Sequence, residues 1–247
     1  MRKLLLAMTL LLLPTVSWSA GGGGYPLDHA PIDVHNEASL QRGAKWFVNY
    51  CMGCHSLEYQ RWSRFARDAG LSDDQVTDNL IFTGVKVGDT MKNALPKDDS
   101  KRWFGAAPPD LSVMARARGA DYLYTYLRTF YLDDSRPLGV NNAVFPAVGM
   151  PHVMWDQQGW QKPVYETHEN DSGEETHTIT GFEIVEEGAM KPHEFDAAMA
   201  DLVNFLVYTA EPAQLDRKRI GFWVLLYLVV AFVVFYLLKK EYWKDVH

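Results

Sequence analysis

Both cysteines of this 247-residue chain lie in one motif, C-M-G-C-H, which runs from Cys51 to His55. C-x-x-C-H is the attachment pattern of c-type haem, because two thiols one helical turn apart can add to the haem vinyl groups and the adjacent histidine can bind the iron. A disulfide between Cys51 and Cys54 would not need the histidine. A zinc site usually needs a second pair of ligands, and the chain has no further cysteines. The motif therefore predicts a domain folded around one covalent haem c, with His55 as the proximal ligand.

The second axial ligand must come from elsewhere in the chain. A methionine there raises the reduction potential and closes the iron to outside ligands, which suits electron transfer. Met150 is the leading candidate because it lies in a loop stiffened by proline and glycine, F-P-A-V-G-M-P-H-V-M-W. His152 and Met154 are rivals in the same loop. Met199 has the helical spacing of a core residue instead.

Residues 220–238 form an uninterrupted run of nineteen residues without a charge. As a helix this run is about 28 Å long, enough to cross the hydrocarbon of a bilayer. A buried core helix is the alternative, but apolar residues all round the helix and basic residues at both ends favour a membrane anchor over residues 217–240.

The first twenty residues have the form of a secretory signal peptide, with a basic start, an apolar run and small residues near position 20. An uncleaved anchor is the alternative, but an apolar run of about ten residues is too short to span a bilayer. Basic residues flank both ends of the C-terminal span, so the positive-inside rule gives no orientation. The signal peptide predicts that residues 21–216 face the periplasm and that residues 241–247 form a short cytoplasmic tail.

The exported part is predicted to be mainly α-helical with long loops. Helices are expected over residues 36–50, capped by Asn36, over 121–131, and over 195–210, ended by Pro212. Residues 70–103 are polar and are expected to be irregular. Residues 161–194 have the composition of a polar, acidic insertion, and their alternating pattern predicts a short β-hairpin.

The exported part is also strongly acidic, with a formal charge of −13 over residues 21–216. This charge argues against a nucleic-acid partner and favours a basic protein partner, since net charge steers encounter rather than fold.

Four stretches together resemble the cytochrome c1 family. They are R-G-A-K-W-F-V-N-Y-C-M-G-C-H-S-L (42–57), A-P-P-D-L-S with A-R-A-R-G after it (107–119), M-P-H-V-M-W (150–155), and D-L-V-N-F-L-V-Y-T-A-E-P-A-Q-L-D-R-K-R-I-G-F (201–222), directly before the anchor. C-x-x-C-H alone would indicate only a c-type cytochrome. The other blocks and their order are far more specific.

The resemblance implies a cytochrome c-like helical fold around the haem, with His55 and Met150 as axial ligands. It also implies that Arg116 pairs with a haem propionate and that Pro109, with Pro108, stiffens a loop against the haem edge. An arginine suits a carboxylate, but a surface arginine and a simple turn are equally compatible with these residues. Because no cysteine is left for a disulfide, the Met150 loop is expected to be held by packing alone.

By the same resemblance, the chain belongs in a bacterial inner membrane as a subunit of ubiquinol–cytochrome c reductase, beside cytochrome b and the Rieske iron–sulfur protein. Its expected role is to relay single electrons from the Rieske protein to a cytochrome c, so enzyme activity would belong to the complex rather than to this chain alone. The alternatives are an anchored cytochrome that serves a terminal oxidase or a nitrogen-oxide reductase, a haem enzyme or sensor with an open iron site, and a haem-free subunit with a disulfide.

Overall fold

Helices dominate the computed structural model, which describes residues 24–169 and 175–244. The predicted mainly α class is confirmed. The predicted signal peptide, residues 1–20, and the last three residues of the predicted tail lie outside the described residues. In chain order the elements are α2 (Glu37–Trp46), η1 (Phe47–Cys51), β1 (Leu57–Arg61), α3 (Trp62–Asp68), α4 (Asp73–Leu80), β2 (Thr90–Met91), α5 (Lys97–Phe104), α6 (Met114–Arg118), α7 (Ala120–Arg128), β3 (Phe130–Leu132), β4 (Val140–Asn142), α8 (Trp155–Gln158), β5 (Gly159–Glu169), β6 (Glu175–Glu187), α9 (Pro192–Ala210) and α10 (Gln214–Tyr242).

The first helical segment begins at the predicted cap. The Asn36 side chain accepts a hydrogen bond from the backbone N–H of Ser39 at 3.1 Å, which satisfies one of the free donors at the start of α2. After Trp46 the chain continues as the π-helix η1, and the N–H of Met52 donates to the carbonyl of Phe47. The segment thus delivers Cys51 to the end of a wide helical turn, and such turns are frequent at functional sites.

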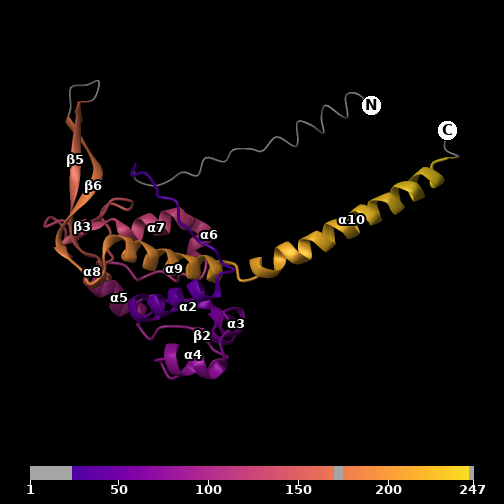
Figure 1. Cartoon of the computed structure of the whole chain (residues 1–247), viewed down its shortest axis with the longest axis horizontal. Helices are drawn as coiled ribbons and strands as arrows, with labels where there is room; N and C mark the ends of the chain where they lie inside the picture. Colours follow the sequence, from indigo (N-terminus) through magenta and orange to yellow (C-terminus); the bar gives the residue numbers. More distant parts are fainter. Residues whose placement is uncertain (1–23, 170–174, 245–247) are drawn as a thin grey trace.

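Helices α2 and α9 cross at a position that requires glycine. A Cβ atom added to Gly43 would lie 2.1 Å from the carbonyl oxygen of Asp201, so the two backbones meet only because Gly43 has no side chain. Beside this crossing, the Arg42 guanidinium donates to both carboxylate oxygens of Asp201 at 2.6 and 2.9 Å. Figure 1 shows α9 between α2 on one side and α6 and α7 on the other.

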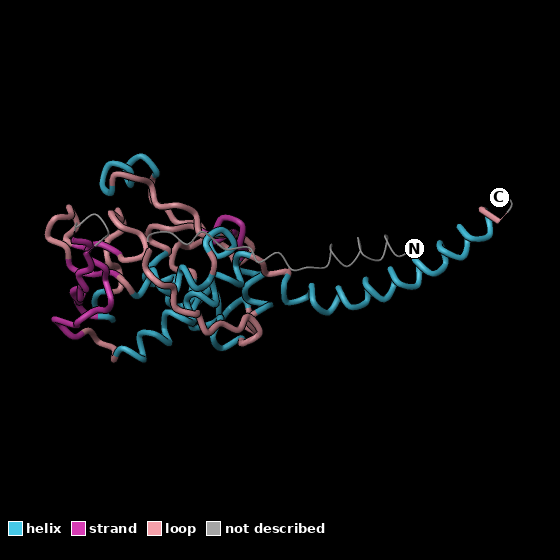
Figure 2. Tube along the Cα trace, turned by 90° about the horizontal axis from the view of Figure 1, so that it is seen from above, coloured by secondary structure: helices cyan, strands magenta, loops and turns pink. Residues whose placement is uncertain are grey.

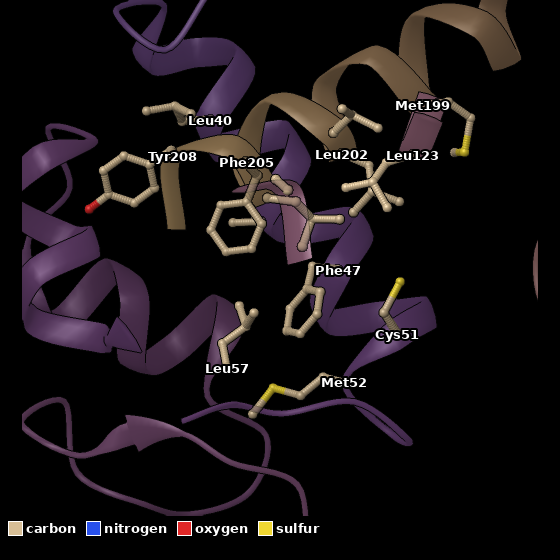
Figure 3. Close-up of a cluster of buried hydrophobic side chains, with 14 of the residues drawn as sticks. Leu40, Phe47, Cys51, Met52, Leu57, Leu123, Met199, Leu202, Phe205 and Tyr208 are labelled. Atoms are coloured by element: carbon tan, nitrogen blue, oxygen red, sulfur yellow. The ribbon is translucent and has the colours of Figure 1, made fainter. Parts of the chain in front are cut away.

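The hydrophobic core lies along these helices. Phe47 of η1 contacts Phe205 of α9, with ring centroids 5.6 Å apart, and Phe205 meets Phe65 of α3 edge-on at 5.3 Å. Figure 3 shows Leu40, Phe47, Leu202, Phe205 and Tyr208 gathered around this contact. Met199 is fully buried in the same cluster, as predicted for a core residue. Burial of each large apolar side chain contributes about 1.5–3 kcal/mol, so this cluster holds the helices together.

Two predictions of local structure were wrong. Residues 70–103 were expected to be irregular, but they contain α4, begun by a capping box between Ser72 and Gln75, and α5. The helix expected over 121–131 ends at Arg128, because Phe130–Leu132 pair with Val140–Asn142 as an antiparallel ladder. Pairing with a neighbouring strand, across residues 133–139, overrides local helical spacing.

The acidic insertion forms a hairpin that is longer than expected. Strands β5 and β6 pair from Gly159↔Glu187 to Glu169↔Glu175, and two register shifts interrupt the ladder. Figure 1 shows the hairpin projecting from the end of the domain opposite to α10. Its base is held by Phe182, whose ring lies 6.0 Å from that of Tyr25 and 6.2 Å from that of Tyr131.

Helix α10 leaves the rest of the described chain after its first turn, in which Leu215 still packs against the core. Its apolar part, Ile220–Tyr242, is 23 residues long, and none of its most apolar window is buried. At 1.5 Å per residue this part is about 34 Å long, which exceeds the hydrocarbon thickness of a typical bilayer. Figure 2 shows α10 extending away from the helical domain. The helix is therefore long and apolar enough to be the predicted anchor.

Candidate haem site

A cavity of about 390 Å³ opens between the attachment motif, α6, α7, α9 and the loop that carries Met150. This volume is within the usual range for cofactor sites. Its wall is largely aliphatic and aromatic. Its lining residues include Tyr50, Cys51, Cys54, His55, Pro109, Met114, Arg118, Tyr122, Tyr126, Val148 and Met150.

The two cysteines lie one turn apart on the cavity wall, both as free thiols. Backbone hydrogen bonds from Cys54 and His55 to the carbonyl of Cys51, at 3.0 and 2.8 Å, close the turn. Burial, with a smaller effect of Cys54, raises the pKa of the Cys51 thiol to about 12. Figure 3 shows the Cys51 sulfur on the side of the core where Leu123 and Leu202 lie, and both of these leucines also line the cavity.

His55 is oriented by a single hydrogen bond. Its Nδ1 lies 2.7 Å from the carbonyl oxygen of Pro109, which can only accept, so Nδ1 carries the proton and the Nε2 lone pair is left free. Burial lowers the pKa of His55, although Pro109 and Asp110 oppose the shift. The imidazole is therefore neutral at pH 7 and can act as a metal ligand through Nε2.

The A-P-P-D-L-S segment is joined directly to the chain that follows the attachment motif. The N–H of Leu111 donates to the carbonyl of Ser56 at 2.9 Å. The carboxylate of Asp110 accepts from the N–H of Glu58 at 2.8 Å, and the Ser112 hydroxyl accepts from that of Tyr59 at 3.1 Å. These bonds fix Pro109 against His55, so the proline predicted at the haem edge lines the cavity and also sets the tautomer of the histidine.

Of the three predicted candidates for the second ligand, only Met150 lines the cavity. His152 is buried elsewhere, stacked on Phe130 at 5.2 Å, and burial lowers its pKa to about 4. Met154 is buried in the main core. Met114 also lines the cavity, but it follows Leu111 by three residues and so belongs to the segment that is joined to His55.

The loop that carries Met150 is held by more than packing, which corrects the expectation from the sequence. The buried Asn142 side chain accepts from the N–H groups of Val144 and Phe145, both at 3.0 Å, and donates to the carbonyl of Tyr126 at 2.7 Å. The Asn141 side chain accepts from the N–H of Ala147 at 2.8 Å. Ala147 has a positive φ of 61°, which these bonds help to maintain.

The structure places a different arginine at the cavity from the predicted one. Arg116 is exposed on α6 and does not line the cavity, whereas Arg118 does. The guanidinium of Arg118 lies 5.4 Å from the centre of the Tyr122 ring. In A-R-A-R-G the two arginines are two positions apart, which places them about 200° apart around a helix. Only one of them can face the cavity, and the motif alone does not say which.

Two tyrosines at the site were missed by sequence reasoning. The Tyr50 hydroxyl donates to Asp156 of α8 at 2.9 Å, which links η1 to the segment just beyond Met150. The Tyr126 hydroxyl lies 3.4 Å from the sulfur of Met150. Tyr50 directly precedes Cys51, and Tyr126 lies in the aromatic-rich α7. Neither position in the sequence indicates which residue the tyrosine hydroxyl contacts.

Comparison with known proteins matches residues 28–246 to the family model described as the Cytochrome C1 family. The chain belongs to the cytochrome c1 family. It is 53% identical over the whole length of both chains to cytochrome c1 of Allochromatium vinosum, and 25% identical over 94% of this chain and 72% of the relative to the mitochondrial cytochrome c1 haem protein of Saccharomyces cerevisiae. A protein of Nitrosomonas europaea named ammonia monooxygenase gamma subunit is 47% identical over 98% of this chain and 97% of its own.

Family membership confirms the resemblance recognised from the four sequence blocks, and it implies haem c. The cavity fits this group. It has a suitable volume and an apolar wall, which presents two thiols, a neutral imidazole with a free Nε2, a thioether and an arginine. In the described ranges 24–169 and 175–244, no group of three or more His, Cys, Asp or Glu side chains is placed to hold a bare metal ion. The zinc alternative thus finds no ligand set in those ranges.

The hydrogen bonds of Asn142 give a first prediction. Asn142→Ala leaves the N–H groups of Val144 and Phe145 and the carbonyl of Tyr126 without their side-chain partner. Each buried unpaired group costs about 1–3 kcal/mol. We expect the free energy of unfolding of the haem-loaded chain to fall by about 2 kcal/mol or more, measured by guanidinium denaturation.

Asn49→Ala is the matched control, because Asn49 is exposed and its amide bonds only to Lys45 within its own helical segment. Its expected effect is within about 0.5 kcal/mol. Equal effects of the two substitutions would show that the asparagine bonds do not hold the Met150 loop.

Proposed function

We propose that this chain is a membrane-anchored c-type cytochrome that relays single electrons within ubiquinol–cytochrome c reductase. One haem c would be attached through Cys51 and Cys54, with His55 and Met150 as its axial ligands. The observation that carries the proposal is that these four side chains line one apolar cavity in a chain of the cytochrome c1 family. When bound, the haem iron accepts and returns one electron without taking part in bond making.

The residues of the cavity would keep this site suited to electron transfer alone. His55 is held in the ligand tautomer by Pro109, so it needs no rearrangement to bind iron. Met150 would fill the sixth position and keep outside ligands away from it, and its loop is braced by Asn141 and Asn142. A closed site with a thioether ligand favours a relay over an open-site enzyme or sensor.

Arg118 is the residue that we propose as the partner of a haem propionate, in place of the predicted Arg116. It is the charged side chain among the described residues that line the cavity, and an arginine binds a carboxylate through strong charge-assisted hydrogen bonds. The ring of Tyr122 lies beside the guanidinium and limits its freedom.

Replacing the axial thioether tests the proposal. In Met150→Leu the cavity keeps its shape, but the side chain no longer presents a ligand atom. We expect the purified, reduced full chain to bind carbon monoxide only after this substitution, with loss of the sulfur-to-iron charge-transfer band in the oxidised optical spectrum. The unsubstituted protein should give a low-spin c-type spectrum that carbon monoxide does not change.

Met114→Leu is the matched substitution within the same cavity and should leave the spectrum low-spin. If Met114→Leu opened the iron and Met150→Leu did not, the ligand assignment would move to Met114. Carbon monoxide binding by the unsubstituted protein would instead support the open-site enzyme or sensor.

The membrane arrangement is part of the same proposal. Helix α10 would anchor the chain in the bacterial inner membrane, with the haem domain in the periplasm and the C-terminus in the cytoplasm. The sequence of residues 1–20 has the form of a signal peptide, and this supports the orientation, because cleavage of such a signal would leave everything before the anchor outside. The partners would be cytochrome b and the Rieske protein in the membrane complex and a cytochrome c as acceptor. Quinol oxidation would then be an activity of the complex, to which this chain contributes the haem c step.

The acidic charge of the hairpin supports the proposal that the electron acceptor is a basic cytochrome c. Residues 159–187 contain eight Asp and Glu and one Lys, and the hairpin lies at the end of the domain away from the anchor. Clustered charge of one sign raises the rate of encounter with an oppositely charged partner, and salt screens this effect.

A neutralised hairpin tests this steering. Replacing the exposed Glu183, Glu186 and Glu187 by Gln should slow electron transfer to a basic cytochrome c several-fold at low salt and flatten its dependence on ionic strength, as measured by stopped flow. The same charge change at the exposed Asp73, Asp74 and Asp78 of α4 is the control. If the two sets had equal effects, the steering would come from net charge and not from the hairpin.

A further inference from the structure

Tyr126 contacts Met150 from the last turn of helix α7. Its hydroxyl oxygen lies 3.4 Å from the Met150 sulfur, which is hydrogen-bonding distance for sulfur. A thioether can only accept a hydrogen bond, so the phenol must be the donor. A thioether sulfur has two lone pairs, and the bond from Tyr126 uses only one of them.

Two aromatic neighbours hold the ring of Tyr126. Tyr122 stacks on it with an interplanar angle of 9°, and Phe130 meets it edge-on at 5.2 Å. The carbonyl of Tyr126 accepts from the Asn142 side chain, which also braces the loop that carries Met150. Met150, Tyr126 and Trp160 pack on a small separate cluster of Phe130, Val140 and Val148. The donor and the acceptor of this bond are therefore held by the same set of contacts.

We infer that Tyr126 is a positioning residue that raises the reduction potential of the site by donating a hydrogen bond to the sulfur of Met150. This inference rests on the proposed role of Met150 as an axial ligand. A hydrogen bond draws electron density from the sulfur, so the thioether donates less to the iron. Weaker donation disfavours the oxidised form more than the reduced form, and hydrogen bonding to a ligand is one of the means by which proteins adjust haem potentials.

Tyr126→Phe removes the hydroxyl and keeps the ring and its aromatic contacts. In the full haem-loaded chain, we expect the equilibrium constant for reduction to fall about two- to tenfold. That change corresponds to a potential lower by about 20–60 mV at 59 mV per tenfold for a one-electron couple. The potential is measured by spectroscopic redox titration, and the sulfur-to-iron charge-transfer band should persist with a shifted position.

Tyr124→Phe is the matched control, because Tyr124 lies on the same helix but faces Arg128, outside the residues that line the cavity. Its potential should match that of the unsubstituted chain. Site-specific fluorotyrosine at position 126 provides an opposite test, since a more acidic phenol is a stronger donor and should raise the potential.

The outcomes separate this inference from the proposed function. If the charge-transfer band persists and neither change at Tyr126 moves the potential, the inference is wrong and the ligand assignment stands. If the unsubstituted protein lacks that band, or Met150→Leu retains it, the ligand assignment itself fails. If Tyr124→Phe lowered the reduction potential as much as Tyr126→Phe, the inference would also be overturned, because the effect would not depend on the bond to Met150.

Discussion

The hydrogen bond from His55 Nδ1 to the carbonyl of Pro109 joins segments 54 residues apart and defines one side of the site. It selects the tautomer that leaves Nε2 free, and it requires the A-P-P-D-L-S segment to lie against the attachment motif. The neighbouring bonds from Leu111 to Ser56 and from Glu58 to Asp110 hold the two segments in that register. The bond between His55 and Pro109 therefore depends on these neighbouring hydrogen bonds. Both segments together form the cavity wall on this side.

The crossing of α2 and α9 is the scaffold that supports these two hydrogen-bonded segments. Gly43 lets the two helices approach closely enough for Phe47 and Phe205 to meet, and η1 then carries Cys51 out of the core to the cavity. The other side of the cavity is built differently, from a loop whose backbone is bonded by two asparagine side chains. A rigid helical side and a braced loop side together suit a site whose ligand geometry changes little between oxidation states.

Much of this site could be predicted from the sequence, because its chemistry is local. C-M-G-C-H specifies the thiols and the imidazole within five residues. The Pro- and Gly-bounded loop limited the second ligand to Met150, His152 and Met154, and the family resemblance favoured Met150. The choice between Arg116 and Arg118 could not be predicted, since it depends on the rotation of the short helix α6. The bond from Asn142 to the carbonyl of Tyr126 and the bond from Tyr126 to Met150 join segments that only the folded chain brings together. In the fold, caps and apolar spacing predicted α2 and α9. The strand β3 replaced the end of a predicted helix because it pairs with β4, and helical spacing does not reveal that pairing.

X-ray absorption at the iron edge of the purified full chain tests the assignment of His55 and Met150 as axial ligands, because it reports the atoms bound to the iron. Ligation by His55 and Met150 predicts one sulfur neighbour in both oxidation states, with the remaining ligands nitrogen. A first shell containing only nitrogen would contradict the assignment of Met150, and a vacant sixth position would contradict the closed electron-relay site.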